Sequence, residues 1–213
     1  MTLKGLPRRF ARLDLNALDV LPTNWTAELL EAVETHARPA RLDASDGSSL
    51  EPPGTVIEYE LLDGAQVAQT VPWLDRLYRN EFLQLASETW GGQLLASDDI
   101  RNGVNVNILR GRGSKYEWHV DTNPLTGLLF ATSHDLEDGG MLTFRGEYDD
   151  AVCVPCAGHL LLFDAREAPH RVTPLKRRGI RVSVPMNFFT AETLAERSPA
   201  LDGYLYSRTK VDS

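Results

Sequence analysis

The chain has 213 residues, of which 42% are hydrophobic and 24% are charged, with 22 Lys and Arg against 30 Asp and Glu. This composition is typical of a globular protein with one core, and it excludes a disordered or collagen-like chain. The net charge of -8 argues against nucleic acid or an anionic membrane surface as the main partner. A neutral or cationic small molecule is the better expectation for the substrate.

The apolar runs are short throughout. The longest of them, such as 127–131 and 160–163, fall far below the roughly 18 residues that a membrane-spanning helix needs. The N-terminal segment carries basic residues but no apolar stretch behind them, which is the pattern of a chain without a secretory signal. We therefore expect a cytoplasmic protein.

Helical periodicity dominates the first hundred residues. Residues 24–37 place Leu29, Leu30 and Val33 at helical spacing, which predicts an amphipathic helix. The stretch 72–90 has its apolar side chains mostly on one helical face and is followed by two glycines, which predicts a second helix.

Two other segments of this part differ from the helices. Residues 55–62 have the composition of a strand, and residues 43–54 are rich in Asp, Ser, Gly and Pro, which predicts a loop. We expect the helices to cover a sheet that begins with this strand.

The pattern changes between residues 102 and 189. Short segments rich in Val, Leu, Phe and Thr now recur with Gly, Asp or Pro between them, which indicates strands and turns. The eight predicted strands are 103–110, 115–121, 126–133, 140–146, 151–155, 159–165, 170–174 and 180–189. So many short strands favour a closed or double-sheet core such as a jelly roll.

The organisation predicted from these elements is a single domain over residues 1–213. It is mainly β with flanking helices, around a double-stranded β-helix (jelly-roll, cupin-like) core. The predicted parts are an N-terminal helical layer with the first strand (1–100), the catalytic core (101–190), and a C-terminal helix and tail (191–213).

One histidine of the five stands two residues before a carboxylate, in His119-Val120-Asp121. On a strand, residues i and i+2 point to the same face, so the imidazole and the carboxylate would lie side by side. His170, which begins a later strand-like segment, could return beside them as a third ligand. Two imidazoles and one carboxylate on one face of a metal form the facial triad of non-haem Fe(II) oxygenases.

Arg181 and Ser183 lie in the last strand-like segment and share one face of it. A guanidinium and a hydroxyl on one strand face can hold a carboxylate by an ion pair and a hydrogen bond. The competing interpretations are a salt-bridged sheet edge for Arg181 and an ordinary strand serine for Ser183.

These residues resemble the 2-oxoglutarate- and Fe(II)-dependent dioxygenases, including their prolyl-hydroxylase-like branch, over roughly residues 100–190. The family's HxD…H triad would fall on His119, Asp121 and His170, and its Arg-x-Ser clamp on Arg181 and Ser183. Further landmarks that match are Gly111, Gly113 and Tyr116 before the first histidine, Gly139-Gly140, and the run from Pro155 through Gly158 to Phe163.

The resemblance implies an oxygenase that uses Fe(II), 2-oxoglutarate and O2, with the three triad residues as metal ligands. Arg181 and Ser183 would bind the distal carboxylate of 2-oxoglutarate. Tyr116 is a further candidate for contact with 2-oxoglutarate, or else a core residue. Where the family often has a tyrosine, this chain has Arg110, and Asn105 and Asn107 could replace that contact or be polar core residues.

The spacing between the last histidine and the clamp is slightly longer than is usual in the family. Arg178 lies closer to His170 than Arg181 does, but Arg181 continues the alternating run into the last strand. Asp121 separates the chain from the family's halogenases, which lack the carboxylate ligand.

Two other classes of protein could use the same residues. A cupin-type metal protein that is not an oxygenase would keep the three ligands without needing Arg181 and Ser183. A zinc hydrolase would need a glutamate base near the ligands, and Glu117 would share a face with His119 in a regular strand.

The remaining candidate groups have plain structural interpretations. His134 is expected in an exposed acidic loop, with a contact to the substrate or a supporting place behind the site residues as the alternative, and Trp118 is expected to face away from His119. Cys153 and Cys156 form a lone CVPC pair without a second ligand pair, so they are expected to be structural.

For the reaction, the resemblance implies oxidation of a substrate C–H bond with formation of succinate and CO2. Hydroxylation is the default outcome, with cyclisation, desaturation or epimerisation as variants. We expect a small metabolite of natural-product (antibiotic) biosynthesis as the substrate, and a prolyl or other amino-acid hydroxylase as the alternative.

Overall fold

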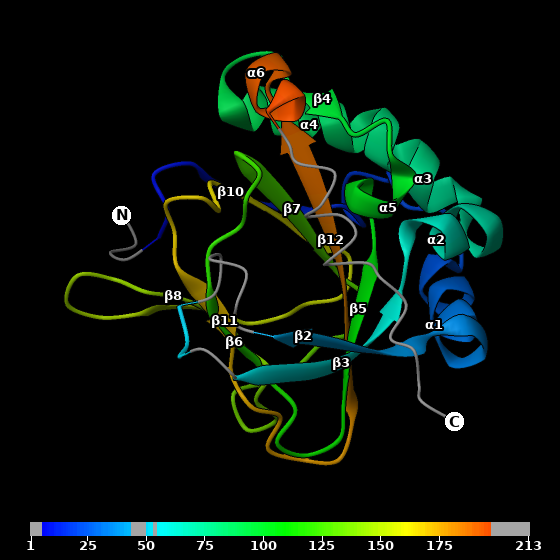
Figure 1. Ribbon diagram of the computed structural model, residues 1–213. Helices are drawn as coiled ribbons and strands as arrows, with labels where there is room; N and C mark the ends of the chain where they lie inside the picture. Colours follow the sequence, from blue (N-terminus) through cyan, green and yellow to red (C-terminus); the bar gives the residue numbers. More distant parts are fainter. Residues whose placement is uncertain (1–5, 44–49, 53–54, 197–213) are drawn as a thin grey trace.

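The computed structural model describes residues 6–43, 50–52 and 55–196 (Figure 1). The helices are α1 (Trp25–His36), α2 (Gly64–Thr70), α3 (Pro72–Arg79), α4 (Glu81–Trp90), α5 (Ile100–Gly103) and α6 (Ala191–Ala195). The strands are β1 (Phe10–Asp14), β2 (Arg38–Asp43), β3 (Val56–Leu62), β4 (Leu95–Ala96), β5 (Val106–Arg110), β6 (Tyr116–His119), β7 (Leu125–Phe130), β8 (Leu142–Phe144), β9 (Ala151–Cys153), β10 (His159–Phe163), β11 (His170–Val172) and β12 (Ile180–Phe189).

Two antiparallel sheets make up the β structure. The larger sheet has eight strands in the order β1-β10-β7-β12-β5-β3-β2, with β4 paired to β12. The smaller sheet has four strands in the order β6-β11-β8-β9. The eight strands predicted between residues 102 and 189 are β5 to β12, so the prediction of a mainly β jelly roll with flanking helices is confirmed.

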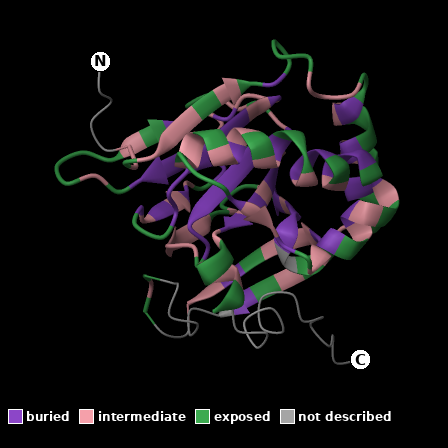
Figure 2. Ribbon diagram, turned by 90° about the horizontal axis from the view of Figure 1, so that it is seen from above, coloured by how far each residue is buried: buried purple, intermediate pink, exposed green. Residues whose placement is uncertain are grey.

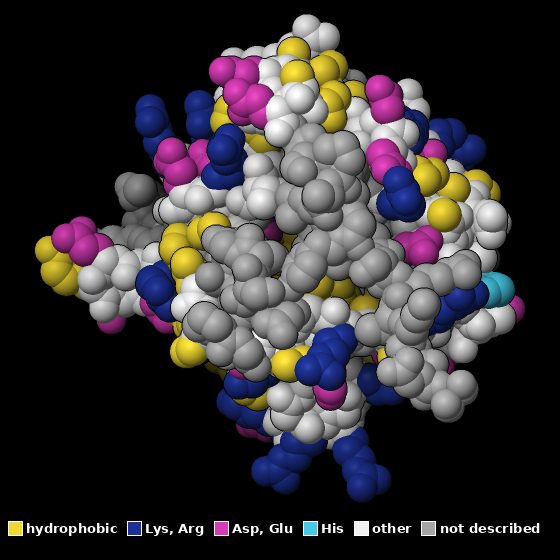
Figure 3. All heavy atoms as spheres, viewed as in Figure 1, with side chains coloured by type: hydrophobic (Ala, Val, Ile, Leu, Met, Phe, Trp, Pro, Cys, Tyr) yellow, Lys and Arg dark blue, Asp and Glu magenta, His cyan; other side chains and the backbone are white. Residues whose placement is uncertain are grey.

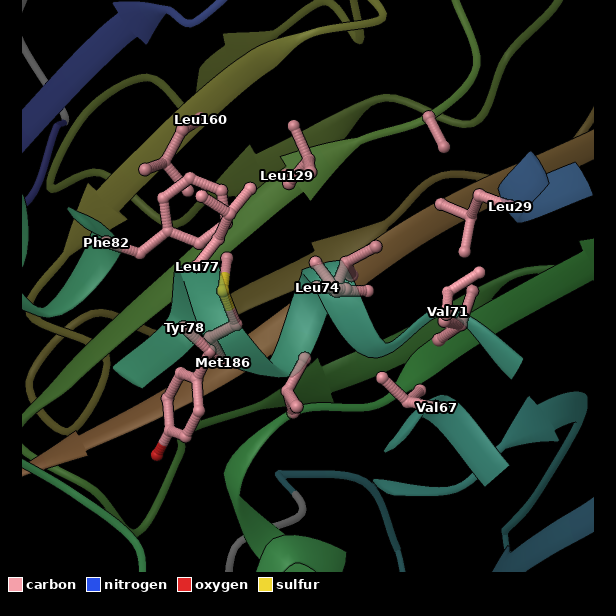
Figure 4. Packing of buried hydrophobic residues seen from close by; sticks show 14 of the residues in the cluster. Leu29, Val67, Val71, Leu74, Leu77, Tyr78, Phe82, Leu129, Leu160 and Met186 are labelled. Carbon is pink, nitrogen blue, oxygen red and sulfur yellow. The ribbon is translucent and has the colours of Figure 1, made fainter. Parts of the chain in front are cut away.

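The helices α1 to α4 lie together on one face of the larger sheet (Figure 1). Their apolar side chains pack against alternate residues of the strands, as Figure 4 shows for Leu74, Leu77 and Phe82 beside Leu129 and Met186. Seen from above, these helices carry buried residues on one side and exposed residues on the other (Figure 2). This packing turns one face of the larger sheet into the main core.

The opposite face of the larger sheet looks toward the smaller sheet. A second apolar cluster lies there, with Leu128, Leu161 and Phe163 from the larger sheet and Leu142 and Phe144 from the smaller one. Because side chains alternate along a strand, the residues of β12 that do not face the helices face this space. The polar candidates described below lie around it.

The N-terminal hundred residues contain more strands than the sequence predicts. Only β3 was expected there, whereas the structure also has β1, β2 and β4. β2 lies at the edge of the larger sheet and contains Pro39, which has no backbone N–H for a second neighbour. A short polar edge strand of this kind lacks the alternating apolar pattern that marks a strand in the sequence.

The predicted helix 72–90 was wrong as a single element, because the structure divides it into α3 and α4 at Asn80. Asn80 has non-helical angles of φ -122° and ψ -91°. The helix α2 was not predicted, although Asp63 and Gln66 form a capping box at its start. Most of the predicted loop 43–54 and of the predicted tail 191–213 lies outside the described residues.

Charged side chains of both signs are interspersed on the face of the molecule in Figure 3. None of the helices in the described part of the chain is long and apolar enough to cross a membrane.

Candidate active site

His119, Asp121 and His170 come together in the space between the sheets. One ligand atom from each lies within 4.8 Å of the other two. The carboxylate Oδ1 of Asp121 is 3.7 Å from Nε2 of His119 and 3.8 Å from Nε2 of His170. Two imidazole nitrogens and one carboxylate oxygen are a donor set that fits Fe(II), so the residues present suit the metal that the sequence predicts.

Strand pairing brings the two histidines side by side. His119 ends β6 and His170 begins β11, and the two residues are direct partners in the antiparallel register. Two residues further along β11, Val172 pairs with Tyr116, so three steps on β6 match two on β11. This bulge turns both Tyr116 and His119 toward the same side of the sheet.

The expectation that Asp121 lies on the same strand as His119 was wrong in detail. β6 ends at His119, and Asp121 lies in the segment after it. The backbone N–H of Asp121 donates to the carbonyl of Ala165, which holds this segment against the loop after β10. The carboxylate therefore reaches the histidines from the irregular segment after β6 and not from a regular strand.

Backbone carbonyls fix the tautomer of both histidines. Nδ1 of His119 lies 2.7 Å from the carbonyl of Glu117, and Nδ1 of His170 lies 2.9 Å from the carbonyl of Ala168. A carbonyl oxygen only accepts, so each Nδ1 carries the proton and donates it. Both Nε2 atoms then keep a lone pair for a metal, in the arrangement that is common around metal-binding histidines.

A hydroxyl from the larger sheet holds the other carboxylate oxygen. Thr126 on β7 donates to Oδ2 of Asp121 over 2.5 Å, and Asn123 donates to the Thr126 hydroxyl over 2.9 Å. Oδ1 is thereby left facing the two histidines. Sequence reasoning missed Thr126 and Asn123, because nothing in their spacing distinguishes them from ordinary turn and strand residues.

Arg181 is buried in the middle of the larger sheet. Its strand β12 lies between β7 and β5, and the residue is 3% exposed. Nε donates to the carbonyl of Gly140 and one terminal nitrogen donates to the Ser183 hydroxyl, both over 2.9 Å. The other terminal nitrogen, Nη2, is buried and has no hydrogen-bond partner among the described residues.

The surroundings of Arg181 supply no counter-charge. No carboxylate of the described residues lies within ion-pair distance of it, and burial lowers its pKa to about 10. A buried guanidinium that lacks an anionic partner is costly, so this position suits a ligand that brings a carboxylate. Of the two interpretations of Arg181, the salt-bridged sheet edge is wrong.

The rival arginine lies elsewhere. Arg178 is exposed and sits in a bend before β12, outside the sheet. It therefore cannot offer the buried environment that Arg181 has.

Two adjacent glycines lie close to Arg181 and to the backbone around it. Gly139 and Gly140 both have positive φ, of 75° and 74°, in the loop that leads to β8. A Cβ atom on Gly139 would lie 2.1 Å from the Pro174 carbonyl oxygen, and one on Gly140 would lie 3.2 Å from Cδ of Arg181. Side chains at these two positions would therefore disturb the backbone that accepts the arginine.

The other predicted cosubstrate contacts lie in the same region. Asn107 is the direct partner of Ser183 in the strand register, and it is half-buried. Asn105 is 4% exposed, and its Oδ1 is buried without a hydrogen-bond partner in the described part of the chain. The ring of Tyr116 lies 4.7 Å from that of His119 and 5.9 Å from that of Tyr59.

Trp118 faces away from the predicted metal ligands, as expected. The guanidinium carbons of Arg145 and Arg171 lie over its ring, 4.4 and 4.5 Å from the ring centre. Glu117, the candidate base of a zinc hydrolase, forms an ion pair of 2.5 Å with Lys115. This pairing engages the carboxylate that such a hydrolase would require.

The cysteines contribute no ligand to this site. Both are free thiols, and burial raises the pKa of Cys153 to about 11. The grouping of possible metal ligands in the described residues does not include them.

A cavity of about 250 Å³ is bordered by two residues that lie next to His170, although none of the three candidate metal ligands lines it. It borders on Phe144, whose ring is 6.0 Å from that of His170, and on Ala168, whose carbonyl accepts from His170. The cavity is lined by Leu6, Pro7, Arg8, Phe144, Arg145, Asp164, Glu167 and Ala168. Charged groups of both signs thus surround a space of small-molecule size.

Comparisons with solved structures agree with the jelly roll. The epimerase SnoN from nogalamycin biosynthesis, described as non-haem and alpha-ketoglutarate dependent, is 17% identical with a TM-score of 0.62, over 86% of this chain and 78% of that one. A 2OG-Fe(II) oxygenase family oxidoreductase from Burkholderia pseudomallei is 14% identical with a TM-score of 0.60, over 85% of each chain. A prolyl hydroxylase from Trichoplax adhaerens is 17% identical with a TM-score of 0.61, over 89% of this chain and 87% of that one.

No curated protein matches this sequence. The family model of the 2OG-Fe(II) oxygenase superfamily matches residues 103–189, which include every predicted ligand and clamp residue. The resemblance found in the sequence is thus confirmed: residues 103–189 are similar to the 2OG-Fe(II) oxygenase superfamily, and a second SnoN structure is described as a complex with Fe3+ and alpha ketoglutarate.

Proposed function

We propose that this oxygenase holds Fe(II) with His119, Asp121 and His170 and oxidises a C–H bond of a small metabolite. The observation that carries the proposal is the convergence of the three ligand atoms within 4.8 Å of one another. Both histidines present an unprotonated Nε2 to this point, because their Nδ1 atoms donate to backbone carbonyls.

In this proposal Arg181 and Ser183 hold the distal carboxylate of 2-oxoglutarate. The partnerless Nη2 of Arg181 supports this role, since a carboxylate would supply both the missing acceptor and the missing charge. Asn107, next to Ser183, and Tyr116, next to His119, are the further candidates for contact with 2-oxoglutarate.

When bound, iron and 2-oxoglutarate supply the oxidising power that acts on a substrate C–H bond with O2, while succinate and CO2 are formed. The chain's own residues bind and orient the cosubstrate and the substrate, and they exclude water from the site. The aromatic rings of Phe144 and Phe163 lie 6.0 and 5.2 Å from the His170 ring, and they form an apolar wall beside it. Thr126 keeps the Asp121 carboxylate fixed through its hydrogen bond.

The cavity beside His170 supports a small substrate with charged groups. Glu167 offers a carboxylate to a cationic group of the substrate, as does Asp164 beside its ion pair with Arg9, and Arg8 and Arg145 offer positive charge to an anionic one. Burial, followed by the charge of Glu167, raises the pKa of Asp164, as expected where two carboxylates lie close together. We favour a metabolite of natural-product biosynthesis, with an amino acid or a prolyl residue as the alternative.

An anaerobic titration tests the iron and 2-oxoglutarate assignment. Adding 2-oxoglutarate to the Fe(II)-loaded protein should produce a metal-to-ligand charge-transfer absorption, because the 2-oxo acid binds the iron directly. A cupin-type metal protein that binds no 2-oxoglutarate would give no such band, and that result would overturn the proposal.

A substrate screen tests the proposed class of substrate. Succinate formation above the uncoupled rate should identify the substrate among amino acids, aminoglycosides and proline-containing peptides. Stimulation by the peptides alone would replace the small-metabolite assignment with prolyl hydroxylation.

A further inference from the structure

His134 is a half-buried histidine that the proposed chemistry does not use. It lies in the loop between β7 and β8, and its backbone N–H donates to the carbonyl of Pro155. Nε2 of its ring is 3.2 Å from the hydroxyl of Thr132. Nδ1 is buried and has no hydrogen-bond partner in the described part of the chain. The sequence placed this residue in an exposed acidic loop, whereas its ring points inward.

The imidazole of His134 and the stem of Arg181 pack against the same glycine. The position that a Cβ of Gly140 would take is 3.2 Å from Cδ of Arg181 and 3.7 Å from Nδ1 of His134. The carbonyl of Gly140 also accepts from Nε of Arg181. Replacement of the imidazole could therefore shift Gly140, and with it the guanidinium that donates to the Gly140 carbonyl.

The environment keeps the His134 imidazole neutral. Burial, and then the positive charge of Arg181, lowers its pKa. The groups that act in the opposite direction are Asp138 and Asp135 of its own loop and the backbone of Ile180. These do not reverse the lowering, so the surroundings of the ring favour its neutral form.

Thr132 connects this neutral ring to the strand that carries the clamp. Its hydroxyl oxygen accepts from the backbone N–H of Val182 over 3.0 Å, and Val182 stands between Arg181 and Ser183 on β12. The hydroxyl proton then has two acceptors, His134 Nε2 at 3.2 Å and the Val182 carbonyl at 3.5 Å. The Thr132 hydroxyl thereby links the imidazole to the backbone of Val182.

We infer that His134 is a positioning residue for the cosubstrate, which holds Arg181 and the Val182 backbone so that the guanidinium and the Ser183 hydroxyl bind the distal carboxylate together. The inference rests on the proposed role of Arg181 and Ser183. It adds a residue that contacts neither the metal nor the substrate, and that sets the affinity for one end of 2-oxoglutarate alone.

Binding measurements on the Fe(II)-loaded protein without O2 test this role. His134→Ala should raise the Kd for 2-oxoglutarate by several-fold, up to about tenfold, because the Thr132 hydroxyl loses its imidazole partner and one net hydrogen bond is worth about 0.5–1.5 kcal/mol, where 1.4 kcal/mol corresponds to tenfold. His134→Gln, which keeps a donor and an acceptor, should recover part of the affinity. His36→Ala, at an exposed histidine of α1, is the matched control and should bind as the wild type does.

A cosubstrate analogue shows whether His134→Ala affects only the binding of the distal carboxylate by Arg181 and Ser183 or weakens cosubstrate binding in general. 2-Oxovalerate has the same carbon chain with a methyl group in place of the distal carboxylate. Its affinity should be the same in wild type and in His134→Ala, because Arg181 has no carboxylate to hold in either case. In turnover the variant should raise KM for 2-oxoglutarate and leave kcat at saturation nearly unchanged.

An NMR titration of the imidazole gives a readout that is independent of activity. With Zn(II) as a diamagnetic metal, the pKa of His134 should rise when 2-oxoglutarate is added, because a carboxylate at Arg181 offsets the positive charge that lowers it. His134→Gln assigns the signal. The signal of His36 should not move.

Each result decides the matter. An unchanged Kd in His134→Ala, an equal loss with 2-oxovalerate, or an unmoved His134 pKa would overturn the inference while the proposed function stands. Failure of the wild type to bind 2-oxoglutarate would instead overturn the proposed function, and this inference with it.

Discussion

The two sheets of the jelly roll differ in how the polar side chains of the candidate site are held in place. On the smaller sheet, His119 and His170 are paired through the strand register, and each donates from Nδ1 to a nearby backbone carbonyl. On the larger sheet, Arg181 is buried with one terminal nitrogen that has no partner among the described residues. Local backbone geometry thus fixes the candidate metal ligands, whereas the candidate anion site depends on burial.

The comparison predicts that metal binding and cosubstrate binding can be lost separately. His170→Ala should abolish both stoichiometric Fe(II) binding and turnover, because two remaining ligands hold the metal poorly against water and buffer. Metal analysis of the purified variant after loading measures this effect, the largest expected. Asp121→Gly should remove hydroxylation in the same way. Stoichiometric iron in His170→Ala would place the metal elsewhere.

Arg181→Ala should show the converse behaviour. Loss of one partner of a buried charge pair costs about 2–5 kcal/mol, so KM for 2-oxoglutarate should rise by at least about tenfold. Iron affinity should barely change, which direct Fe(II) titration can verify.

The exposed neighbour provides the control for this change. Arg178→Ala should leave KM for 2-oxoglutarate within about threefold, as expected of a surface substitution. A larger effect at Arg178 than at Arg181 would reverse the assignment of the clamp.

A substitution at Thr126 tests whether a residue of the larger sheet also contributes to iron binding. It belongs to the larger sheet, yet its hydroxyl donates to Asp121. Thr126→Val should weaken Fe(II) binding by about tenfold, at the lower end of what loss of a residue behind a metal ligand costs. Ser183→Ala, also on the larger sheet, should weaken 2-oxoglutarate binding and leave iron affinity unchanged. Equal iron affinity in Thr126→Val and wild type would show that Asp121 needs no support from β7.

The smallest effect concerns Trp118 on the smaller sheet. Trp118→Leu removes two stacking contacts with guanidinium groups and should lower the free energy of unfolding by about 1–2 kcal/mol. Trp90→Leu removes a single such contact, with Arg9, and should cost about half as much. Urea denaturation of both variants measures the difference. A larger loss in Trp90→Leu would mean that the stack on Trp118 does not stabilise the sheet.

Sequence patterns predicted the eight core strands because apolar runs alternated with turn residues. The spacing in His119-Val120-Asp121 and the pair Arg181 and Ser183 also stood out, since residues two apart on a strand share a face. The structure brings His119, Asp121 and His170 together, and it buries Arg181 beside Ser183. These features depend on short-range periodicity, which a sequence displays directly.

Other features depend on contacts that a sequence does not display. The bulge in β6 arises from pairing with β11, and the hydrogen bond of Thr126 to Asp121 arises from packing between the sheets. The break at Asn80 leaves no Pro or Gly as a signal, because the apolar pattern continues through it. His134 was misplaced because its acidic neighbours suggested solvent, while tertiary packing against Arg181 and Gly140 buries its ring.

The buried guanidinium of Arg181 should lower the stability of the folded chain, although the proposed binding of 2-oxoglutarate requires it. A charge with no counter-ion in a dry interior destabilises the folded chain, and replacing such a group by an apolar one is often neutral or stabilising. In the absence of 2-oxoglutarate, Arg181→Leu should therefore melt at the same temperature as the wild type or higher. Added 2-oxoglutarate at 100 times its Kd should stabilise the wild type by about 2.7 kcal/mol and leave the variant almost unaffected. The melting temperature of this enzyme should therefore rise with the concentration of 2-oxoglutarate.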